Sequence, residues 1–72
     1  MKTLADYTVV VMPDDGTFLA YVPAIPGCHA VGDTREEAQR ELRLVFEMFA
    51  EDARESGRAL PPNVRELVPV AG

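Results

Sequence analysis

The stretch that decides the fold is TFLAYVPAIPGCHAVGDTREEA, from Thr17 to Ala38. Its β-branched and aromatic residues up to Val22 predict a strand, and Pro23 ends that strand because proline has no N–H to donate to a sheet. Pro26-Gly27 is a turn dipeptide, and Cys28 to Val31 predicts a second, short strand. The chain therefore turns a rigid corner between two strands.

A capped helix follows this corner directly. The hydroxyl of Thr34 can accept a hydrogen bond from the Glu37 N–H, while the Glu37 carboxylate reaches back to the Thr34 N–H. Gly57 supplies a C-terminal stop, so we predict a helix from Arg35 to Ser56. The apolar residues that repeat at helical spacing and form its buried stripe are Ala38, Leu42, Val45, Phe46, Phe49 and Ala53.

Upstream of this stretch, Leu4 to Met12 predicts a first strand. Pro13-Asp14-Asp15-Gly16 joins it to Thr17, either as a four-residue loop or as a two-residue Asp15-Gly16 turn, and both leave the alternation of faces unchanged. The residues on one face would be Tyr7, Val9, Val11, Phe18, Ala20 and Val22. Those on the other face would be Thr8, Val10, Met12, Leu19 and Tyr21.

Downstream of the helix, Leu60-Pro61-Pro62-Asn63 is a rigid connector, and Val64 to Val70 predicts a last strand in which Pro69 favours an edge or a strand end. The predicted fold is α+β with the order β-β-β-α-β. It consists of one helix packed on a small, mostly antiparallel sheet, in a single domain that spans residues 1–72.

The composition predicts self-association. A chain of 72 residues has a thin core, and its 47% apolar content exceeds what that core can use. Leu44 and Met48 lie off the buried stripe and widen the apolar surface of the helix. We therefore expect a homo-oligomer, a dimer or a tetramer, with Leu44 and Met48 in the interface.

The charge limits the classes of partner. Twelve acidic and seven basic residues give a net charge of -5, so direct nucleic acid binding is not expected and a basic protein is the better candidate partner. The single cysteine, Cys28, excludes an internal disulfide and favours a reducing, cytoplasmic location. Neither a signal peptide nor an apolar run of about 18 residues is present in the sequence, so no membrane association is expected.

The residue chemistry indicates no catalytic or metal site. His29 and Cys28 are adjacent in a strand, so their side chains point to opposite faces. A two-metal nuclease site needs several carboxylates that converge. The aspartates have turn, cap or strand-start positions instead: Asp6, Asp14, Asp15 and Asp33. We expect no catalytic residue, no metal and no cofactor, and predict that the chain is not an enzyme.

Two sequence blocks, with the order and spacing they have here, resemble the HicB-like antitoxin family. The first is PAIPGC at residues 23–28, and the second is GDTREEA at residues 32–38. The resemblance extends over nearly the whole chain and includes Tyr7, Asp15-Gly16, Gly57 and Leu60-Pro61. The positions that carry the family signature are Pro23, Pro26, Gly27, Gly32, Thr34, Glu37 and Ala38.

This resemblance implies a partial ribonuclease-H-like fold without catalytic carboxylates. It also implies an antitoxin of a type II toxin-antitoxin system, which binds and blocks HicA, a small basic toxin that cleaves mRNA. Many family members carry a C-terminal DNA-binding segment, for which a chain that stops at Gly72 has no room. We therefore expect no autonomous operator binding.

Two hypotheses about function follow. In the first, the chain inhibits a HicA-type toxin through the sheet face that carries Leu19 and Tyr21, or through the acidic helix end formed by Glu51, Asp52 and Glu55. In the second, it is a solitary oligomeric HicB-like domain with a ligand-binding or scaffolding role and no toxin partner.

Overall fold

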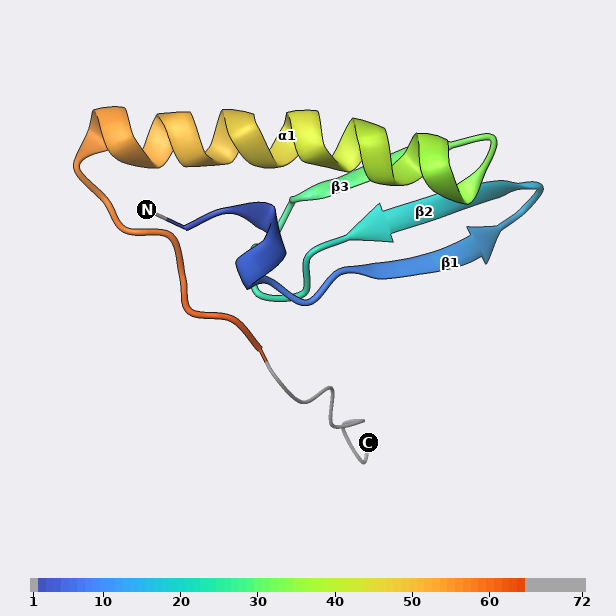
Figure 1. Ribbon diagram of the computed structural model, residues 1–72, viewed down its shortest axis with the longest axis horizontal. Coiled ribbons are helices and arrows are strands. Elements are labelled where there is room, and N and C mark those ends of the chain that lie inside the picture. The colour runs from blue at the N-terminus through green and yellow to red at the C-terminus, as the bar shows by residue number, and fades with distance from the viewer. Residues whose placement is uncertain (1, 65–72) are drawn as a thin grey trace.

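A computed structural model describes residues 2–64 of the chain. A 3-10 helix, η1 (Leu4–Asp6), precedes strands β1 (Val10–Asp14), β2 (Thr17–Tyr21) and β3 (His29–Gly32), and helix α1 (Arg35–Ser56) follows. The strands form an antiparallel sheet in the order β1-β2-β3, and α1 runs along one face of it (Figure 1). The predicted α+β fold is confirmed, whereas the predicted last strand lies outside the described residues beyond Val64.

The core lies between α1 and the sheet, as the alternation of residues predicts. The residues predicted on the face of the sheet that carries Tyr7 either belong to the core or pack against it. The same holds for the predicted stripe of α1 from Ala38 to Phe49, whereas Ala53 is not part of this cluster. The rings of Tyr7 and Phe46 meet with their centroids 5.6 Å apart. The buried residues that make up the core are Tyr7, Ala20, Val22, Ile25, Cys28, Ala38, Leu42 and Phe46.

The first strand was predicted too early in the sequence. Leu4–Asp6 is a 3-10 helix, because the Asp6 N–H donates to the Thr3 carbonyl oxygen at 2.9 Å and the Thr3 N–H donates to the Asp6 carboxylate at 2.8 Å. The acidic side chain thus closes a local turn that competes with an extended chain. β1 begins only at Val10 and continues through Pro13 and Asp14.

The β1–β2 hairpin has the tighter of the two possible turns. Asp14 pairs with Thr17, which leaves only Asp15 and Gly16 in the loop, with φ of 48° and 85°. Positive φ at both central residues is the geometry of a type I′ turn, whose twist matches that of the flanking strands. Pro13 can therefore lie inside β1, because its nitrogen points to the outer edge of the sheet.

Two consecutive turns build the corner between β2 and β3. The Ile25 N–H donates to the Val22 carbonyl oxygen at 3.0 Å, and the Cys28 N–H donates to the Ile25 carbonyl oxygen at 3.1 Å. In the second turn, Pro26 is followed by Gly27 at φ 84°, the arrangement that a type II turn requires. The Pro23, Pro26 and Gly27 signature positions therefore fix the chain path and bury Ile25.

The helix has the predicted bounds and the predicted caps at both ends. The Glu37 N–H donates to the Thr34 hydroxyl at 3.0 Å, and Gly57 ends α1 in the left-handed conformation at φ 72°. No return bond from the Glu37 carboxylate to the Thr34 N–H is present among residues 2–64, so one half of the predicted capping box forms. The hydroxyl alone is sufficient to satisfy an N–H of the first turn.

The junction of β3 and α1 explains the remaining signature positions. A Cβ on Gly32 would overlap the backbone nitrogen of Ala38 and lie 2.8 Å from the Glu37 carbonyl carbon. Ala38 is itself fully buried. Glycine at position 32 and alanine at position 38 thus allow the strand end to touch the helix backbone.

After α1, the connector returns to the start of the sheet. The Tyr7 hydroxyl donates to the Pro61 carbonyl oxygen, and the Thr8 N–H donates to the Asn63 side-chain oxygen at 2.8 Å. The Thr8 hydroxyl also donates to the Val64 carbonyl oxygen, at 3.0 Å. These bonds hold the segment from Pro61 to Val64 beside the chain that leads into β1.

Candidate protein-binding surfaces

The sheet face opposite α1 is apolar and open. Leu19 and Tyr21, predicted as partner-binding residues, lie together on it, half-buried by their neighbours, and Met12 beside them is 42% exposed. With the corner loop they line a shallow groove whose other wall is formed by Pro23, Pro26 and His29. The sequence predicted the strand side of this groove, but the contribution of the loop depends on how the two turns fold back.

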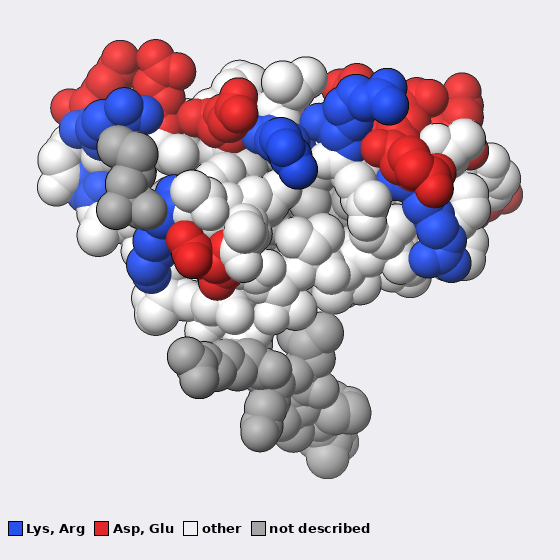
Figure 2. Space-filling model, in the orientation of Figure 1, with Lys and Arg blue, Asp and Glu red and all other residues white. Residues whose placement is uncertain are grey.

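The exposed surface of α1 carries its charges on two different sides. Arg43, Glu47 and Arg54 line a hollow against the N-terminal segment that contains η1. Figure 2 shows basic and acidic side chains interspersed along the upper part of the molecule, where α1 lies. At 100° per residue, the helix side turned away from this hollow carries four carboxylates and one methionine. We call this side the acidic flank and define it as Glu37, Glu41, Met48, Asp52 and Glu55.

The acidic flank lies toward β3. The helix side opposite the acidic flank lines the hollow and therefore lies next to η1, which leads into β1. β1 and β3 are the two edges of the sheet. Figure 1 shows the same order, with β3 as the strand nearest α1 and β1 as the farthest. Glu37 and Glu41 of the acidic flank therefore stand above the β3 edge, whereas Asp52 and Glu55 lie beyond it, since Gly32 meets Ala38 and Gly27 already lies beside Phe49.

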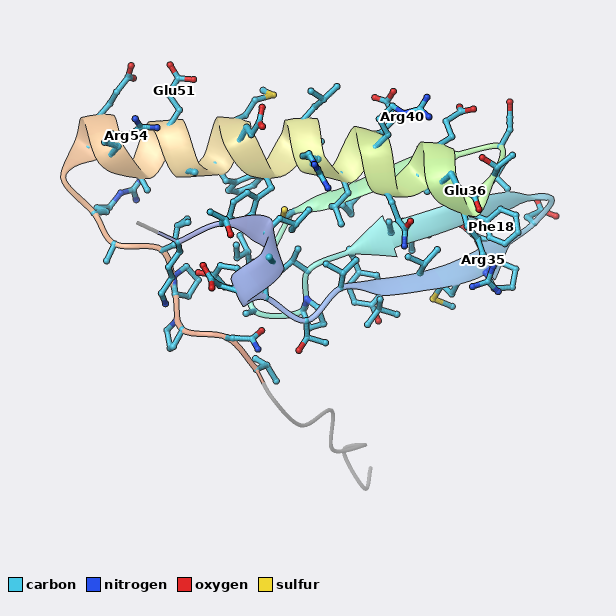
Figure 3. All side chains as sticks on the ribbon, in the orientation of Figure 1. Phe18, Arg35, Glu36, Arg40, Glu51 and Arg54 are labelled. Atoms are coloured by element: carbon cyan, nitrogen blue, oxygen red, sulfur yellow. The ribbon has the colours of Figure 1, made fainter. Side chains whose placement is uncertain are left out.

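The predicted acidic helix end does not form one patch. Glu51 lines the hollow beside Arg54, and Figure 3 shows both at the C-terminal end of α1. Asp52 lies on the acidic flank, where its carboxylate meets the Arg58 guanidinium at 3.2 Å in an exposed ion pair. Only Asp52 and Glu55 remain as candidate partner-binding residues on that side, and both are exposed.

The predicted oligomer interface residues are exposed on the helix. Leu44 is 53% exposed and Met48 is 69% exposed, on the outer surface of α1. They lie on the opposite side of the molecule from Leu19 and Tyr21, since α1 covers the other face of the sheet. Residues 2–64 thus present two separate exposed apolar surfaces, on opposite sides of the molecule.

The neighbouring Cys28 and His29 side chains, which could have suggested a metal or nucleophilic site, are separated in space. Cys28 is in the core at 1% exposure, while His29 is exposed on the opposite side of β3. Within residues 2–64, no group of three or more His, Cys, Asp or Glu residues is arranged to hold a metal ion. In the same part of the chain, α1 is too polar to cross a membrane.

The Cys28 thiol is expected to react slowly in the native protein. Burial raises the pKa of the Cys28 thiol above its ordinary value, and only the thiolate attacks a disulfide reagent. The folded chain therefore disfavours the thiolate, and stability should fall as the pH rises above the ordinary pKa of a thiol. With an aromatic disulfide reagent at pH 8, we expect the native rate to be roughly 100-fold below the rate in urea, since reaction requires local opening. Equal rates would show that Cys28 is accessible.

The fold defines a small α+β domain with exposed apolar and acidic surfaces. A family model described as UPF0150-like matches residues 2–60, and the chain belongs to this UPF0150 family. A UPF0150 protein of Synechocystis sp. is 35% identical over 66 residues, which cover 90% of each chain. A UPF0150 protein of Thermoplasma acidophilum is 31% identical over 65 residues, which cover 89% of this chain and 94% of the relative. No solved structure matches the chain significantly.

Proposed function

We propose that the protein is an antitoxin-like binding protein that neutralises a small basic HicA-type toxin by direct contact. The observation that carries this proposal is the acidic flank, which sets four carboxylates and the exposed Met48 along one side of α1, toward an open sheet edge. Such a surface attracts a basic partner and gives it an apolar contact in the middle. The resemblance of residues 23–28 and 32–38 to the HicB-like family supplies the class of partner.

In this role the chain acts by occlusion. It needs no catalytic group, metal, cofactor or nucleic acid of its own, and it acts in the cytoplasm, where mRNA is cleaved. The partial ribonuclease-H-like fold that the resemblance implies stays a prediction, because the strand it would add falls largely outside the described residues.

Exposed apolar residues on both sides of the molecule favour a second candidate function. In a solitary oligomeric domain with a ligand-binding or scaffolding role, self-association would cover Leu44 and Met48, and the groove at Leu19 and Tyr21 would remain available for a ligand. Light scattering after size exclusion measures the assembly directly. This alternative requires a dimer or a tetramer, and a monomer at micromolar concentration contradicts it.

Co-expression with a short basic reading frame encoded next to this chain tests the antitoxin proposal. We expect a tagged chain to capture the basic protein in a defined stoichiometry and to restore the growth that this protein arrests. The absence of such a reading frame, or a failure to capture its product, would contradict the antitoxin role and favour the solitary domain.

A further inference from the structure

β3 is an edge strand whose outer side has no partner in the described part of the chain. The Val22 N–H donates to the Cys28 carbonyl oxygen at 3.0 Å, and Ala20 pairs with Ala30. Because bonding and non-bonding residues alternate in an antiparallel pair, the N–H and C=O groups of His29 and Val31 point away from β2. No hydrogen bond among residues 2–64 uses these groups.

The two edges of the sheet differ in how they can receive another strand. Pro13 pairs with Phe18, and Phe18 forms its backbone bonds with β3, so the Pro13 nitrogen occupies the outer edge of β1 without an N–H. The sequence of β3 is His-Ala-Val-Gly, with no proline or charged residue to block pairing. An edge of that kind is a template for strand addition.

The N-terminal part of the acidic flank lies above the β3 edge, because Gly32 at the end of β3 meets Ala38 of α1, and Gly27, just before β3, already lies beside Phe49. A strand added there would run beside Glu37 and Glu41 on its upper side. On its lower side it would continue the open face next to Val31, which is 51% exposed. The site therefore offers backbone hydrogen bonds, negative charge and apolar contact along one line, as a basic strand with alternating apolar residues requires.

We propose that the outer edge of β3 and the acidic flank of α1 form one docking site for an extended segment of a basic protein. This inference rests on the proposed function, since it states where and how the basic toxin is held. A second copy of this chain fits poorly. Pairing two β3 edges about a two-fold axis would bring the same flank of both helices together and oppose carboxylates to carboxylates.

The probe for this site is an eight-residue peptide of alternating lysine and valine with blocked ends, titrated into the isotope-labelled full chain and followed by amide NMR shifts. We expect saturable shifts that are largest at His29 and Val31. Two comparison peptides should bind at least tenfold more weakly. One has glutamate in place of lysine, and the other has proline at a central valine, which removes a strand hydrogen bond.

Three variants separate the parts of the site. Val31→Pro removes an outward N–H and the exposed valine side chain while leaving the bonds to β2 in place, so it should weaken peptide binding at least tenfold without changing the fold seen by circular dichroism. Glu37→Lys combined with Glu41→Lys should do the same, because it reverses the two charges of the acidic flank that lie above β3. Glu47→Lys combined with Glu51→Lys reverses two charges on the other side of α1 and should bind as the unmodified chain does.

Several outcomes would overturn the docking site. One is an acidic peptide that binds as tightly as the basic one, and another is a set of NMR shifts that does not include β3. A third is an equal loss of peptide affinity in both charge-reversal pairs, and the fourth is a dimer of the free chain in which the β3 amides are protected from exchange. The last outcome would assign the edge to a second copy. The peptide experiment needs no toxin, so failure to capture a toxin removes the antitoxin role alone, while failure with the peptide removes this docking site alone.

Discussion

Replacing Phe46 with alanine is expected to lower the free energy of unfolding by about 3–5 kcal/mol. The Phe46 ring is buried at the centre of α1, where it packs against the Tyr7 ring. Its removal leaves a cavity beside the Tyr7 ring, between the helix and the N-terminal segment. Since a domain of this length has a total stability of only about 4–11 kcal/mol, the variant should be close to unfolding at room temperature.

Urea unfolding followed by circular dichroism measures this loss, and Met48→Ala is its matched control. Met48 lies on the same helix but is exposed, so its truncation should change stability by no more than about 0.5 kcal/mol. Phe46→Leu should fall between the two because it retains part of the buried volume. If Phe46→Ala and Met48→Ala unfold at the same urea concentration, α1 does not pack through Phe46.

The helix could be predicted to the residue because its determinants are local. Thr34 accepts from the Glu37 N–H three residues later, and Gly57 adopts the left-handed conformation that most residues avoid. Neither feature depends on the rest of the fold. The stripe of α1 was predictable for the same reason, because helical spacing alone decides which side chains share a face.

The start of β1 could not be predicted from strand propensity. The Asp6 carboxylate bonds to the Thr3 N–H, and this short-range bond takes residues from Leu4 to Asp6 out of the strand. The inclusion of Pro13 in β1 was equally hidden. A proline is tolerated there only because β1 is an edge and Pro13 is at an outward position, which is known once the strand order is known.

For the candidate surfaces too, the features that depend on local spacing could be predicted from the sequence, and those that depend on tertiary contacts could not. Leu19 and Tyr21 share a face because strand residues alternate, so their proximity was predictable. Glu51, Asp52 and Glu55 lie within one five-residue stretch of the sequence. Helical spacing already sets Glu51 about 100° away from Asp52. Which of these two sides packs against η1 is a long-range contact that no spacing rule contains.

A second large effect is expected from Gly32→Ala, which adds a single methyl group. The new Cβ would overlap the Ala38 backbone nitrogen and lie 2.9 Å from the Ala38 Cα. Backbone atoms cannot move aside by changing rotamer, so β3 and α1 must separate at their junction. We expect a loss of about 3 kcal/mol or more in unfolding free energy by urea denaturation, at the upper end of what overpacking costs.

Two further variants distinguish this steric cause from a general intolerance of glycine replacement. Gly16 has φ 85° and open space around it, so Gly16→Ala tests backbone strain without a clash and should cost only about 1–2 kcal/mol. Adding Ala38→Gly to Gly32→Ala should restore nothing, because the atoms in conflict belong to the backbone and not to the Ala38 side chain. Restoration by Ala38→Gly would place the conflict in the side chain instead. The glycine of the GDTREEA block would then be required for another reason than contact between the strand and the helix backbone.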